Sequence, residues 1–439
     1  MTARQPRHSQ QGSTALLTDH YELTMVQAAL EAGTAHRRSV FELFPRALPE
    51  GRRYGVVAGV GRALDAVERF VFDDEVLGIL EANHVVDETT LAWLADYRFA
   101  GRIQGYPEGE VYFPYSPLLT VEGSFAECVL LETLLLSILN HDSAVASAAS
   151  RMTWAAAGRP CIEMGSRRTH EEAAVAAARA AYVAGFTTTS NLAAGQRYGV
   201  PTAGTSAHSF TLLHDSEREA FVAQVQSLGK GTSLLVDTYD VAEAVRLAVE
   251  VAGPELGAVR IDSGDLGLLA QEVRELLDSL GAEHTRIIVT SDLDEFAIAS
   301  LAAAPVDGYG VGTSLVTGSG HPTCGFVYKL VAREDDDGTM VNVAKRSTGK
   351  ISIGGRKYAV RRRDRDGVAM AEVVGVGPAP EDSDSRPLLV PLVEDGAVVG
   401  REPLEAARQR HEASRAELPL RARQLSRGEP VIPTRLVDS

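Results

Sequence analysis

Residues 233–281 read SLLVDTYDVAEAVRLAVEVAGPELGAVRIDSGDLGLLAQEVRELLDSLG. Twice in this stretch, a short apolar run passes through a polar turn into an amphipathic helical segment. The same unit continues in RIIVTSD and LDEFAIASLAAA at 286–304, and VDGYGVGTS at 306–314 closes the series. A strand, a polar turn and a helix that recur every ~20–30 residues predict a parallel βα array.

The ends of these predicted strands favour a barrel over an open sheet. Each strand is followed by residues suited to catalysis or phosphate binding, namely Asp237, Asp262 with Ser263, Ser291 with Asp292, and Gly312 with Thr313. A βα barrel gathers the C-terminal ends of its strands around one mouth, whereas an open sheet concentrates such residues at one switch point. No G-x-G-x-x-G motif opens the first βα unit, which argues against a dinucleotide-binding fold. We therefore predict an α/β protein built on an irregular, TIM-like βα barrel.

The flanking segments predict an additional α+β lobe beside the barrel. A helical pattern at 16–32 is followed by a Gly- and Pro-rich alternating stretch at 101–123, which is typical of short antiparallel strands. The C-terminal region is polar and carries short strand patterns such as YAVRRR. We predict four divisions: a disordered tail at 1–15, an N-terminal α+β lobe at 16–135, the barrel with the active site at 136–335, and a C-terminal segment at 336–439 that packs back on the lobe.

Composition excludes several classes of function. The net charge of −16, from 43 basic and 59 acidic residues, leaves no extended basic face for nucleic acid. No run of about 18 apolar residues occurs, so we predict no membrane span. The three cysteines form no C-x-x-C pair, which argues against disulfides and structural zinc and fits a reducing, cytoplasmic location. A small phosphorylated ligand stays compatible with this charge, because glycine-rich turns and a few arginines bind phosphate locally.

The motif RIDSGD at 260–265 is a candidate for chemistry at a strand end. Arg260, Asp262 and Asp265 surround Ser263 where the strand gives way to a helix. Carboxylates three positions apart could hold Mg²⁺ through water or stabilise a cationic transition state. Alternatively, Asp262 or Ser263 caps the following helix.

Two further turns present groups suited to anions. Glycines at 310 and 312 precede Thr313, and successive backbone N–H groups in such a turn form an anion nest. Arg167 and Arg168 follow a glycine and suit bidentate capture of a carboxylate or phosphate. Each turn also has an ordinary explanation, chain punctuation for the glycines and a solvated basic face for the arginines.

His208 lies among small residues in GTSAHSF at 204–210. In such a setting a histidine can be a nucleophile, a proton shuttle or a hydrogen-bonded structural residue. The residue pattern alone favours the structural role.

Taken together, these motifs resemble the nicotinate phosphoribosyltransferase family. They occur in that family's order: LLTDHYELTM at 16–25, LLTVEGSFAE at 118–127, LLETLLLSILN at 130–140, EMGSRR at 163–168, GFTTTSN at 185–191, GTSAHSF, VDTYD at 236–240, RIDSGD and YGVGTSLVT at 309–317. The resemblance extends from Leu16 to Leu330, about three quarters of the chain.

The resemblance implies an irregular α/β barrel with an N-terminal lobe, working as a homodimer with active sites at the subunit boundary. The implied reaction joins nicotinate to 5-phosphoribosyl 1-pyrophosphate, giving nicotinate mononucleotide and pyrophosphate in NAD salvage. ATP is the implied co-substrate, because the family's histidine at the position of His208 is transiently phosphorylated. Mg²⁺ is the implied cofactor, which screens the pyrophosphate leaving group.

Residue roles carry over position by position. The implied catalytic residues are the phosphohistidine and two aspartates: His208, Asp237 and Asp262. The implied substrate-binding residues are Tyr21, Arg167, Thr205, Arg260, Ser263, Gly312 and Thr313, and the implied metal ligand is Asp265. Within these sets, Tyr21 stacks on the pyridine ring from the neighbouring subunit and Arg167 faces the nicotinate carboxylate. Gly312 and Thr313 hold the 5′-phosphate.

Two positions bear on substrate choice. Met164 stands where the family usually has a phenylalanine against the ring, and its polarizable sulfur can still pack there. Ser190 stands where the related nicotinamide enzymes carry an aspartate, which would repel the nicotinate carboxylate. The sequence therefore predicts nicotinate rather than nicotinamide as the substrate.

Other functions explain fewer features. Ser190 argues against a nicotinamide phosphoribosyltransferase, and His208 in its turn argues against a quinolinate phosphoribosyltransferase. A non-catalytic metabolite-binding barrel would be expected to lose His208 or the DSGD carboxylates first. A barrel hydrolase using Asp262 and His208 would need neither the N-terminal tyrosine motif nor the Gly-Thr turn.

Overall fold

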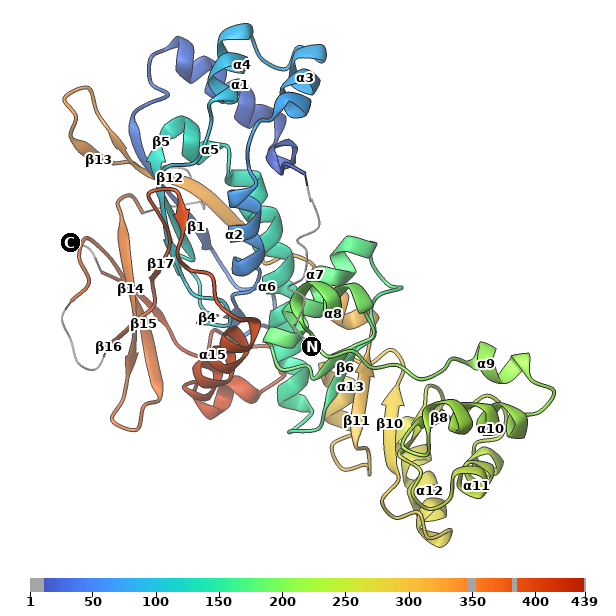
Figure 1. Ribbon diagram of the computed structural model, residues 1–439. Helices are drawn as coiled ribbons and strands as arrows, with labels where there is room; N and C mark the ends of the chain where they lie inside the picture. Colours follow the sequence, from blue (N-terminus) through green and yellow to red (C-terminus); the bar gives the residue numbers. More distant parts are fainter. Residues whose placement is uncertain (1–11, 346–352, 381–384, 438–439) are drawn as a thin grey trace, which may run out of the picture.

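The computed structural model describes residues 12–345, 353–380 and 385–437. The protein has two parts, a lobe of antiparallel sheets and a part built around a parallel sheet, and the long helix α6 (Glu132–Ala155) runs between them (Figure 1). The predicted disordered tail at 1–15 lies outside the described residues up to position 11. Its last residues are described, and Ala15 is buried at the start of the short helix η1 (Ala15–Leu17).

The second part contains six parallel strands, as the βα pattern predicts. Their order is β7 (Thr188–Thr189), β6 (Cys161–Glu163), β11 (Gly308–Val311), β10 (Arg286–Thr290), β9 (Ala258–Ile261) and β8 (Ser233–Leu235). The helices between or after them are α7 (Glu171–Val183), α8 (Leu192–Tyr198), α9 (His208–Leu213), α10 (Glu217–Leu228), α11 (Val241–Ala252), α12 (Leu266–Ser279), α13 (Glu295–Ser300) and α14 (Thr313–Val316). Most of the strands are short apolar runs, as is typical of a parallel sheet whose faces are covered by helices. The predicted α/β class is confirmed.

The curled sheet is not a closed barrel. Among the described residues, β7 and β8 form its two edges and no ladder joins them. A single bridge between Thr189 and Thr202 extends the β7 edge. The six strands thus form part of a barrel wall, with their C-terminal ends on one side.

Aspartates start the helices that follow the strands. Asp240 accepts a hydrogen bond from Glu243 N at 2.9 Å to begin α11, and Asp265 Oδ1 accepts one from Leu268 N at 3.1 Å to begin α12. The alternative that Asp262 or Ser263 caps α12 is therefore wrong. Because Asp265 occupies the cap position, Asp262 is left for other contacts.

The lobe is built from three sheets that combine early and late segments of the chain. Its seven-stranded sheet has the order β13 (Met340–Asn342), β12 (Phe326–Glu334), β1 (Arg38–Pro45), β5 (Leu119–Ser124), β3 (Arg102–Gly105), β17 (Val390–Glu394) and β18 (Ala397–Val398). The smaller sheets are β16 (Ser385–Pro387), β14 (Lys357–Arg363), β15 (Ala369–Val376) and β19 (Thr434–Val437), and the pair β2 (Gly55–Val56) and β4 (Val111–Tyr112). The remaining helices are α1 (His20–Glu31), α2 (Val60–Glu68), α3 (Asp74–Ala82), α4 (Glu88–Ala95), α5 (Phe125–Val129), α15 (Leu404–Ala416) and η2 (Leu420–Arg423).

The segment 125–155, which holds α5 and α6, connects the cores of the two parts. By length and hydropathy alone this segment is apolar enough to cross a membrane, but 67% of its most apolar window is buried inside the protein. Its first half, including Leu134 and Ile138, packs in the core of the lobe. Its second half, including Val145 and Met152, packs in the core beneath the parallel sheet. The burial explains its apolar composition.

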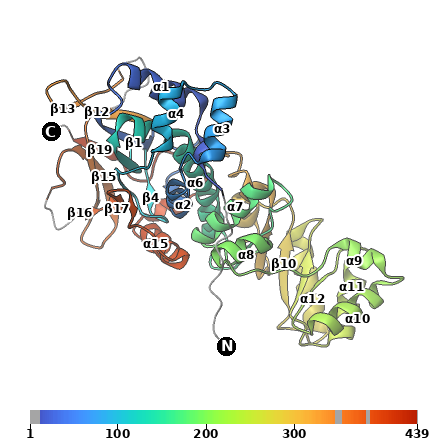
Figure 2. The ribbon, with the colours of Figure 1, turned by 45° about the horizontal axis from the view of Figure 1, so that its top comes forward.

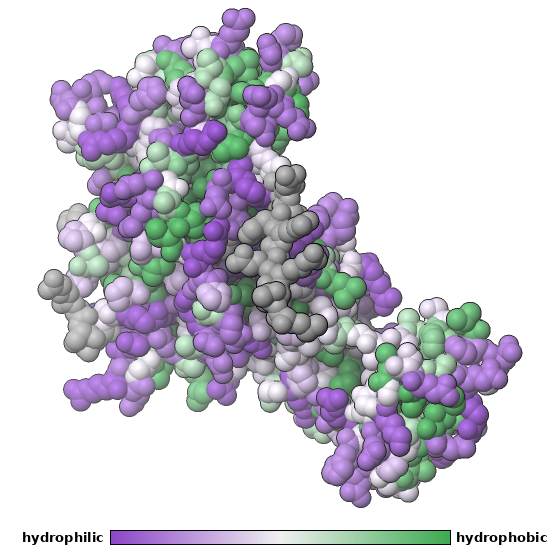
Figure 3. All heavy atoms as spheres, in the orientation of Figure 1, coloured by the Kyte–Doolittle hydropathy of each residue, from purple (hydrophilic) through white to green (hydrophobic). Residues whose placement is uncertain are grey.

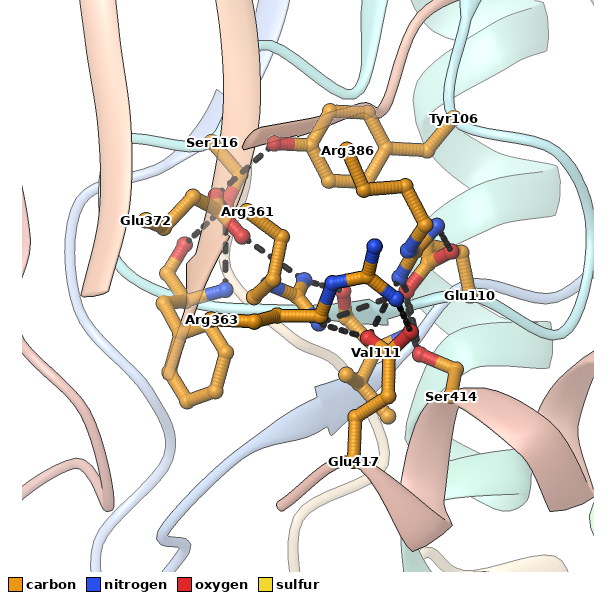
Figure 4. A network of polar contacts seen from close by, with 11 residues as sticks. Tyr106, Glu110, Val111, Ser116, Arg361, Arg363, Glu372, Arg386, Ser414 and Glu417 are labelled. Carbon is orange, nitrogen blue, oxygen red and sulfur yellow. Dashed lines mark hydrogen bonds and ion pairs between the residues drawn. The ribbon is translucent and has the colours of Figure 1, made fainter. Parts of the chain in front are cut away.

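A buried network of charges fastens C-terminal residues to the lobe (Figure 4). Arg361 is 0% exposed and donates to Glu372 Oε2 at 2.9 Å and to the backbone oxygen of Val111 at 2.8 Å. Glu110 Oε2 accepts a hydrogen bond from Arg386 Nη1 at 2.8 Å. Although burial opposes the charged form, the guanidinium groups of Arg361 and Arg386 hold the pKa of Glu110 below its ordinary value.

Candidate active site

The strand register brings polar side chains to one level of the parallel sheet. Arg260 in β9 is paired with Leu235 in β8 and Ile288 in β10, and Thr290 is paired with Gly310 in β11. Because side chains alternate between the two faces of a sheet, the residues two positions beyond Leu235 and Arg260 share a face with Thr290. These residues are Asp237 and Asp262. The strands thus place both predicted carboxylates beside Thr290, where their C-terminal ends meet.

A cavity of about 240 Å³ opens at this end of the sheet. It is lined by Met164, Arg167, Arg168, Asp262, Thr290, Ser291, Asp292, Gly310, Gly312 and Thr313. Glycine is required at 310, since a Cβ there would come within 2.4 Å of Thr290 Cγ2 and 2.7 Å of Met164 Sδ. The predicted arginine turn and glycine turn therefore face the same space as Asp262.

The two aspartates at the cavity are held in fixed orientations. Asp237 Oδ2 accepts hydrogen bonds from Asp262 N at 2.9 Å and from Ser263 Oγ at 2.7 Å. Asp262 Oδ1 accepts a hydrogen bond from the Thr290 hydroxyl. Asp237 Oδ1 is buried and has no hydrogen-bond partner among the described residues. A carboxylate oxygen left unpaired in this way is available to a cation.

His208 stands at the same end of the sheet, at the start of α9. Its Nδ1 lies 3.1 Å from Thr238 Oγ1, and its Nε2 lies 3.9 Å from Asp237 Oδ1 and 4.0 Å from Asp262 Oδ2. The side chain is 40% exposed. An exposed imidazole against two carboxylates is poorly explained as a structural residue and well placed for chemistry.

Arg260 and Arg167 supply positive charge at the site. Burial lowers the pKa of Arg260 from its ordinary value, and Arg167 lowers it further, while the carboxylates of Asp262 and Asp237 oppose the shift. Arg260 Nε is buried without a partner among the described residues. Two guanidinium groups whose charges repel each other are suited to bind an anionic ligand.

The segment 202–208 spans the side of the sheet that the strands leave open. At one end, Ala203 N donates to the backbone oxygen of Thr189 at 2.9 Å on the β7 edge. Arg260 then holds its middle, donating to the Ser206 oxygen at 3.0 Å and to Thr205 Oγ1 at 3.5 Å. His208 ends the segment beside the β8 strand end. Thr205 is thereby placed next to Arg260.

Two predicted residues lie apart from the cavity. Tyr21 belongs to α1, which packs on α4 and α5 at the end of the lobe remote from the parallel sheet (Figures 1 and 2). Its ring is 44% exposed, and burial together with Glu132 and Glu22 raises the pKa of Tyr21 to about 12. Asp265 lies next to the site in sequence, but its Oδ1 is used to cap α12.

The donor set fits a hydrated magnesium ion better than a fully protein-ligated one. Among the described residues, no three His, Cys, Asp or Glu side chains are grouped closely enough to enclose a metal. The unpartnered Oδ1 of Asp237 and the exposed Oδ2 of Asp262 are oxygen ligands of the kind Mg²⁺ prefers. Mg²⁺ commonly keeps several waters and uses only one or two carboxylates, so these residues fit it.

Thr290 and Thr238 have no role assigned from the sequence. Thr290 orients Asp262, and Thr238 contacts His208. Ser291 and Asp292, predicted as strand-end residues suited to catalysis or phosphate binding, both line the cavity. The register of β9 against β10 identifies Thr290, and that register cannot be read from either strand alone.

The family profile and the related sequences identify one family. The profile of the nicotinate phosphoribosyltransferase N-terminal domain matches residues 16–140. A nicotinate phosphoribosyltransferase of Mycobacterium tuberculosis is 56% identical over 446 residues, which cover 99% of this chain and 98% of that protein. One from Bacillus subtilis is 37% identical, covering 80% and 73%. The crystal structure of human nicotinic acid phosphoribosyltransferase matches with a TM-score of 0.81 at 27% identity, covering 96% and 97%.

Proposed function

The chain belongs to the nicotinate phosphoribosyltransferase family, and we propose that it joins nicotinate to 5-phosphoribosyl 1-pyrophosphate in the cavity at the strand ends, as a step of NAD salvage. The observation that carries this placement is the composition of one cavity. It combines a guanidinium for a carboxylate, a glycine-rich turn for a phosphate and a fixed aspartate for a cation.

Each substrate group has a matching side chain. Arg167 and Arg260 bind the nicotinate carboxylate, and Thr205 lies beside Arg260 for the ring or the ribose. Gly312 and Thr313, with Arg168, bind the 5′-phosphate. These contacts hold the ring nitrogen of nicotinate facing C1 of the ribose. Holding the two reacting atoms in a fixed geometry lowers the entropic part of the reaction barrier.

Bond making and breaking at C1 create positive charge on the ribose. Asp262 and Asp237 lie next to this position and stabilise the oxocarbenium-like state electrostatically. Ser263 holds Asp237 in place. Asp237 and Asp262 would hold Mg²⁺, and the ion would neutralise negative charge on the pyrophosphate. Asp265, the metal ligand implied by the resemblance, caps α12 through Oδ1 and would need to turn toward the cavity to take part. The Thr290 hydroxyl keeps Asp262 oriented during the reaction.

His208 is the proposed site of coupling to ATP. In this step an imidazole nitrogen forms a bond to the γ-phosphorus of ATP, the bond from that phosphorus to the β–γ bridging oxygen breaks, and ADP leaves. Water later cleaves the N–P bond and releases inorganic phosphate. The half-exposed imidazole at the cavity edge is accessible to a nucleotide, and the carboxylates near Nε2 orient the ring. Phosphorylation favours substrate binding, and hydrolysis of the phosphohistidine drives the reaction toward mononucleotide.

A homodimer is the proposed assembly. Helix α1, which carries Tyr21, lies at the end of the lobe away from the parallel sheet (Figure 1), so a ring-stacking role for Tyr21 calls for a second subunit. Exposed apolar side chains occur in the part that carries the cavity, including Leu212 at 61% and Leu213 at 78% exposure, and apolar surface is visible there in Figure 3. Such side chains are typical of surfaces that a partner covers.

We also propose that the segment 202–208 completes an irregular barrel, and that the enzyme is cytoplasmic.

The reaction is tested by measuring mononucleotide and pyrophosphate formation from nicotinate, with and without ATP, in the wild type and in His208→Ala. We expect ATP to stimulate the wild type and not the variant. Equal stimulation of both proteins would exclude His208 as the coupling residue. Nicotinamide in place of nicotinate tests the alternative substrate, and Ser190 predicts much slower conversion.

A further inference from the structure

We propose that Glu163 is a positioning residue that fixes the nicotinate subsite by tying together two turns. One turn carries Arg167, and the other carries Ser190. The inference rests on the proposed function, in which Arg167 binds the ring carboxylate and Ser190 admits it.

Glu163 is the last residue of β6, in the interior of the parallel sheet. It is 0% exposed and is paired with Thr189 in β7 and with Val311 in β11. Met164, the next residue, lines the cavity, so strand alternation places Glu163 on the opposite face. Glu163 therefore lies beneath the site and touches no substrate.

The carboxylate of Glu163 belongs to a ring of hydrogen bonds, which the backbone between Gly165 and Ser166 closes. Gly165 N–H donates to Oε1, and the Thr189 hydroxyl donates to Oε2. The Thr189 hydroxyl in turn accepts a hydrogen bond from Asn191 N at 2.9 Å, and Asn191 Nδ2 donates to Ser166 Oγ at 3.1 Å. The ring joins the turn at 164–168 to the turn at 189–191, so neither can shift alone.

The buried carboxyl group of Glu163, like that of Glu22, is held by hydrogen bonds and has no cationic partner among the described residues. Burial raises the pKa of Glu163, and only the hydrogen bonds from Thr189 and Gly165 oppose this shift. Buried Glu108, by contrast, forms an ion pair with Arg179. A buried carboxyl without a cation costs stability, and such costs are typical of residues retained to hold a functional site.

The ring lies under the carboxylate side of the cavity. The turn of Gly312 and Thr313, which is proposed to bind the 5′-phosphate, lies between β11 and α14. It takes part in none of the hydrogen bonds of the ring around Glu163. Loosening the ring should therefore weaken recognition of nicotinate more than recognition of 5-phosphoribosyl 1-pyrophosphate. A residue needed only for folding would show no such difference.

Thr189 provides a matched pair of variants. Thr189→Val removes the hydroxyl at constant shape, whereas Thr189→Ser retains it. We expect Thr189→Val to raise KM for nicotinate about tenfold, with kcat and KM for 5-phosphoribosyl 1-pyrophosphate changed less than about threefold. Thr189→Ser and Glu163→Gln should fall between this variant and the wild type. Thr187→Val, which loses a bond to the Cys161 oxygen at 3.1 Å outside the ring, is the control and should behave as wild type.

Two results would overturn the positioning role. One is identical KM for nicotinate in Thr189→Val and Thr189→Ser. The other is a parallel change in all constants together with a lower melting temperature. Arg167→Ala separates this inference from the proposed function. If Arg167→Ala raises KM for nicotinate and Thr189→Val does not, only the positioning role is wrong. If Arg167→Ala leaves that KM unchanged, the proposed subsite is wrong and the positioning role falls with it.

Discussion

The buried network around Arg361 and the cluster at the cavity differ in how their carboxylates are paired. In the network, Glu110 and Glu372 each have a guanidinium partner, and all three side chains are 0% exposed. At the cavity, Asp237 Oδ1 has no hydrogen-bond partner among the described residues, and Asp262 is 37% exposed. The carboxylates of the network around Arg361 are paired without any ligand, whereas the cluster at the cavity has a carboxylate oxygen without a hydrogen-bond partner among the described residues.

This difference separates charges that hold the fold from charges that serve the reaction. A satisfied buried network specifies one arrangement of the chain and is costly to break. Unpaired groups at a cavity are unfavourable in the free protein and gain their partners when substrate binds. Removing a charge should therefore have opposite consequences for stability in the two places.

The largest effect on stability is expected for Arg361→Ala. The substitution leaves Glu110 and Glu372 buried with weaker pairing, and breaking a buried pair costs roughly 3–5 kcal/mol. Denaturant unfolding measures the loss. Arg362→Ala, at the adjacent exposed position, should cost below ~1 kcal/mol. Similar losses in the two variants would contradict the structural role of the network.

The largest effect on activity is expected for Asp237→Asn. Loss of the negative charge beside the ribose should lower kcat by roughly 10²-fold or more, by analogy with other electrostatic groups at transition states. Unfolding free energy should stay the same or rise, because the lost charge is only partly satisfied in the free protein. A variant that unfolds easily and keeps its kcat would place Asp237 with the structural charges.

A smaller effect is expected from a methyl group in the cavity. Gly310→Ala should displace Thr290 and Met164, because the added Cβ would lie 2.4 Å and 2.7 Å from them. We expect kcat/KM to fall about tenfold through the disturbed Asp262, as small misplacements at a site do. Gly78→Ala in α3, where nothing lies within 4 Å of the added atom, is the control and should leave kcat/KM unchanged.

The smallest effect concerns acid stability. Burial lowers the pKa of His411 from 6.5 to about 3, and the charge of Arg415 acts in the same direction. Between these values the unfolded chain binds a proton that the folded protein excludes, so stability falls as the pH drops below 6.5. His411→Leu should flatten the fall in melting temperature between pH 6.5 and 4. An unchanged pH profile would assign the acid sensitivity to other groups.

Local patterns in the sequence predicted much of the cavity. Each strand ends in a polar turn, and parallel strands bring such ends together, so Asp237, Asp262, Gly312 and Thr313 could be located without coordinates. The order of helices and strands in the parallel part follows from the same periodicity. The residue that caps α12 could not be predicted, because Asp and Ser are both favoured at the N-cap position and only the geometry distinguishes Asp265 from Ser263.

Long-range pairing could not be predicted from the sequence. β12 follows the parallel sheet in the chain but pairs with β1, where Ser39 lies opposite Arg333. Arg361 gains its partner Glu110 only because the C-terminal sheet packs on the lobe. Thr290 reaches Asp262 through strand register, and the lack of a ladder between β7 and β8 depends on sheet curvature. Periodicity within one segment contains none of this information.

We propose that the cavity beside Asp262 is the nicotinate phosphoribosyltransferase active site. The direct measurement is the steady-state rate of nicotinate mononucleotide formation by the wild type, Asp262→Asn and Asp294→Asn. Asp294 caps α13 in the next βα unit and serves as the matched aspartate outside the cavity. We expect Asp262→Asn to lose about 10²-fold or more in kcat while Asp294→Asn stays near the wild-type rate. Full activity in Asp262→Asn would contradict the assignment of the cavity.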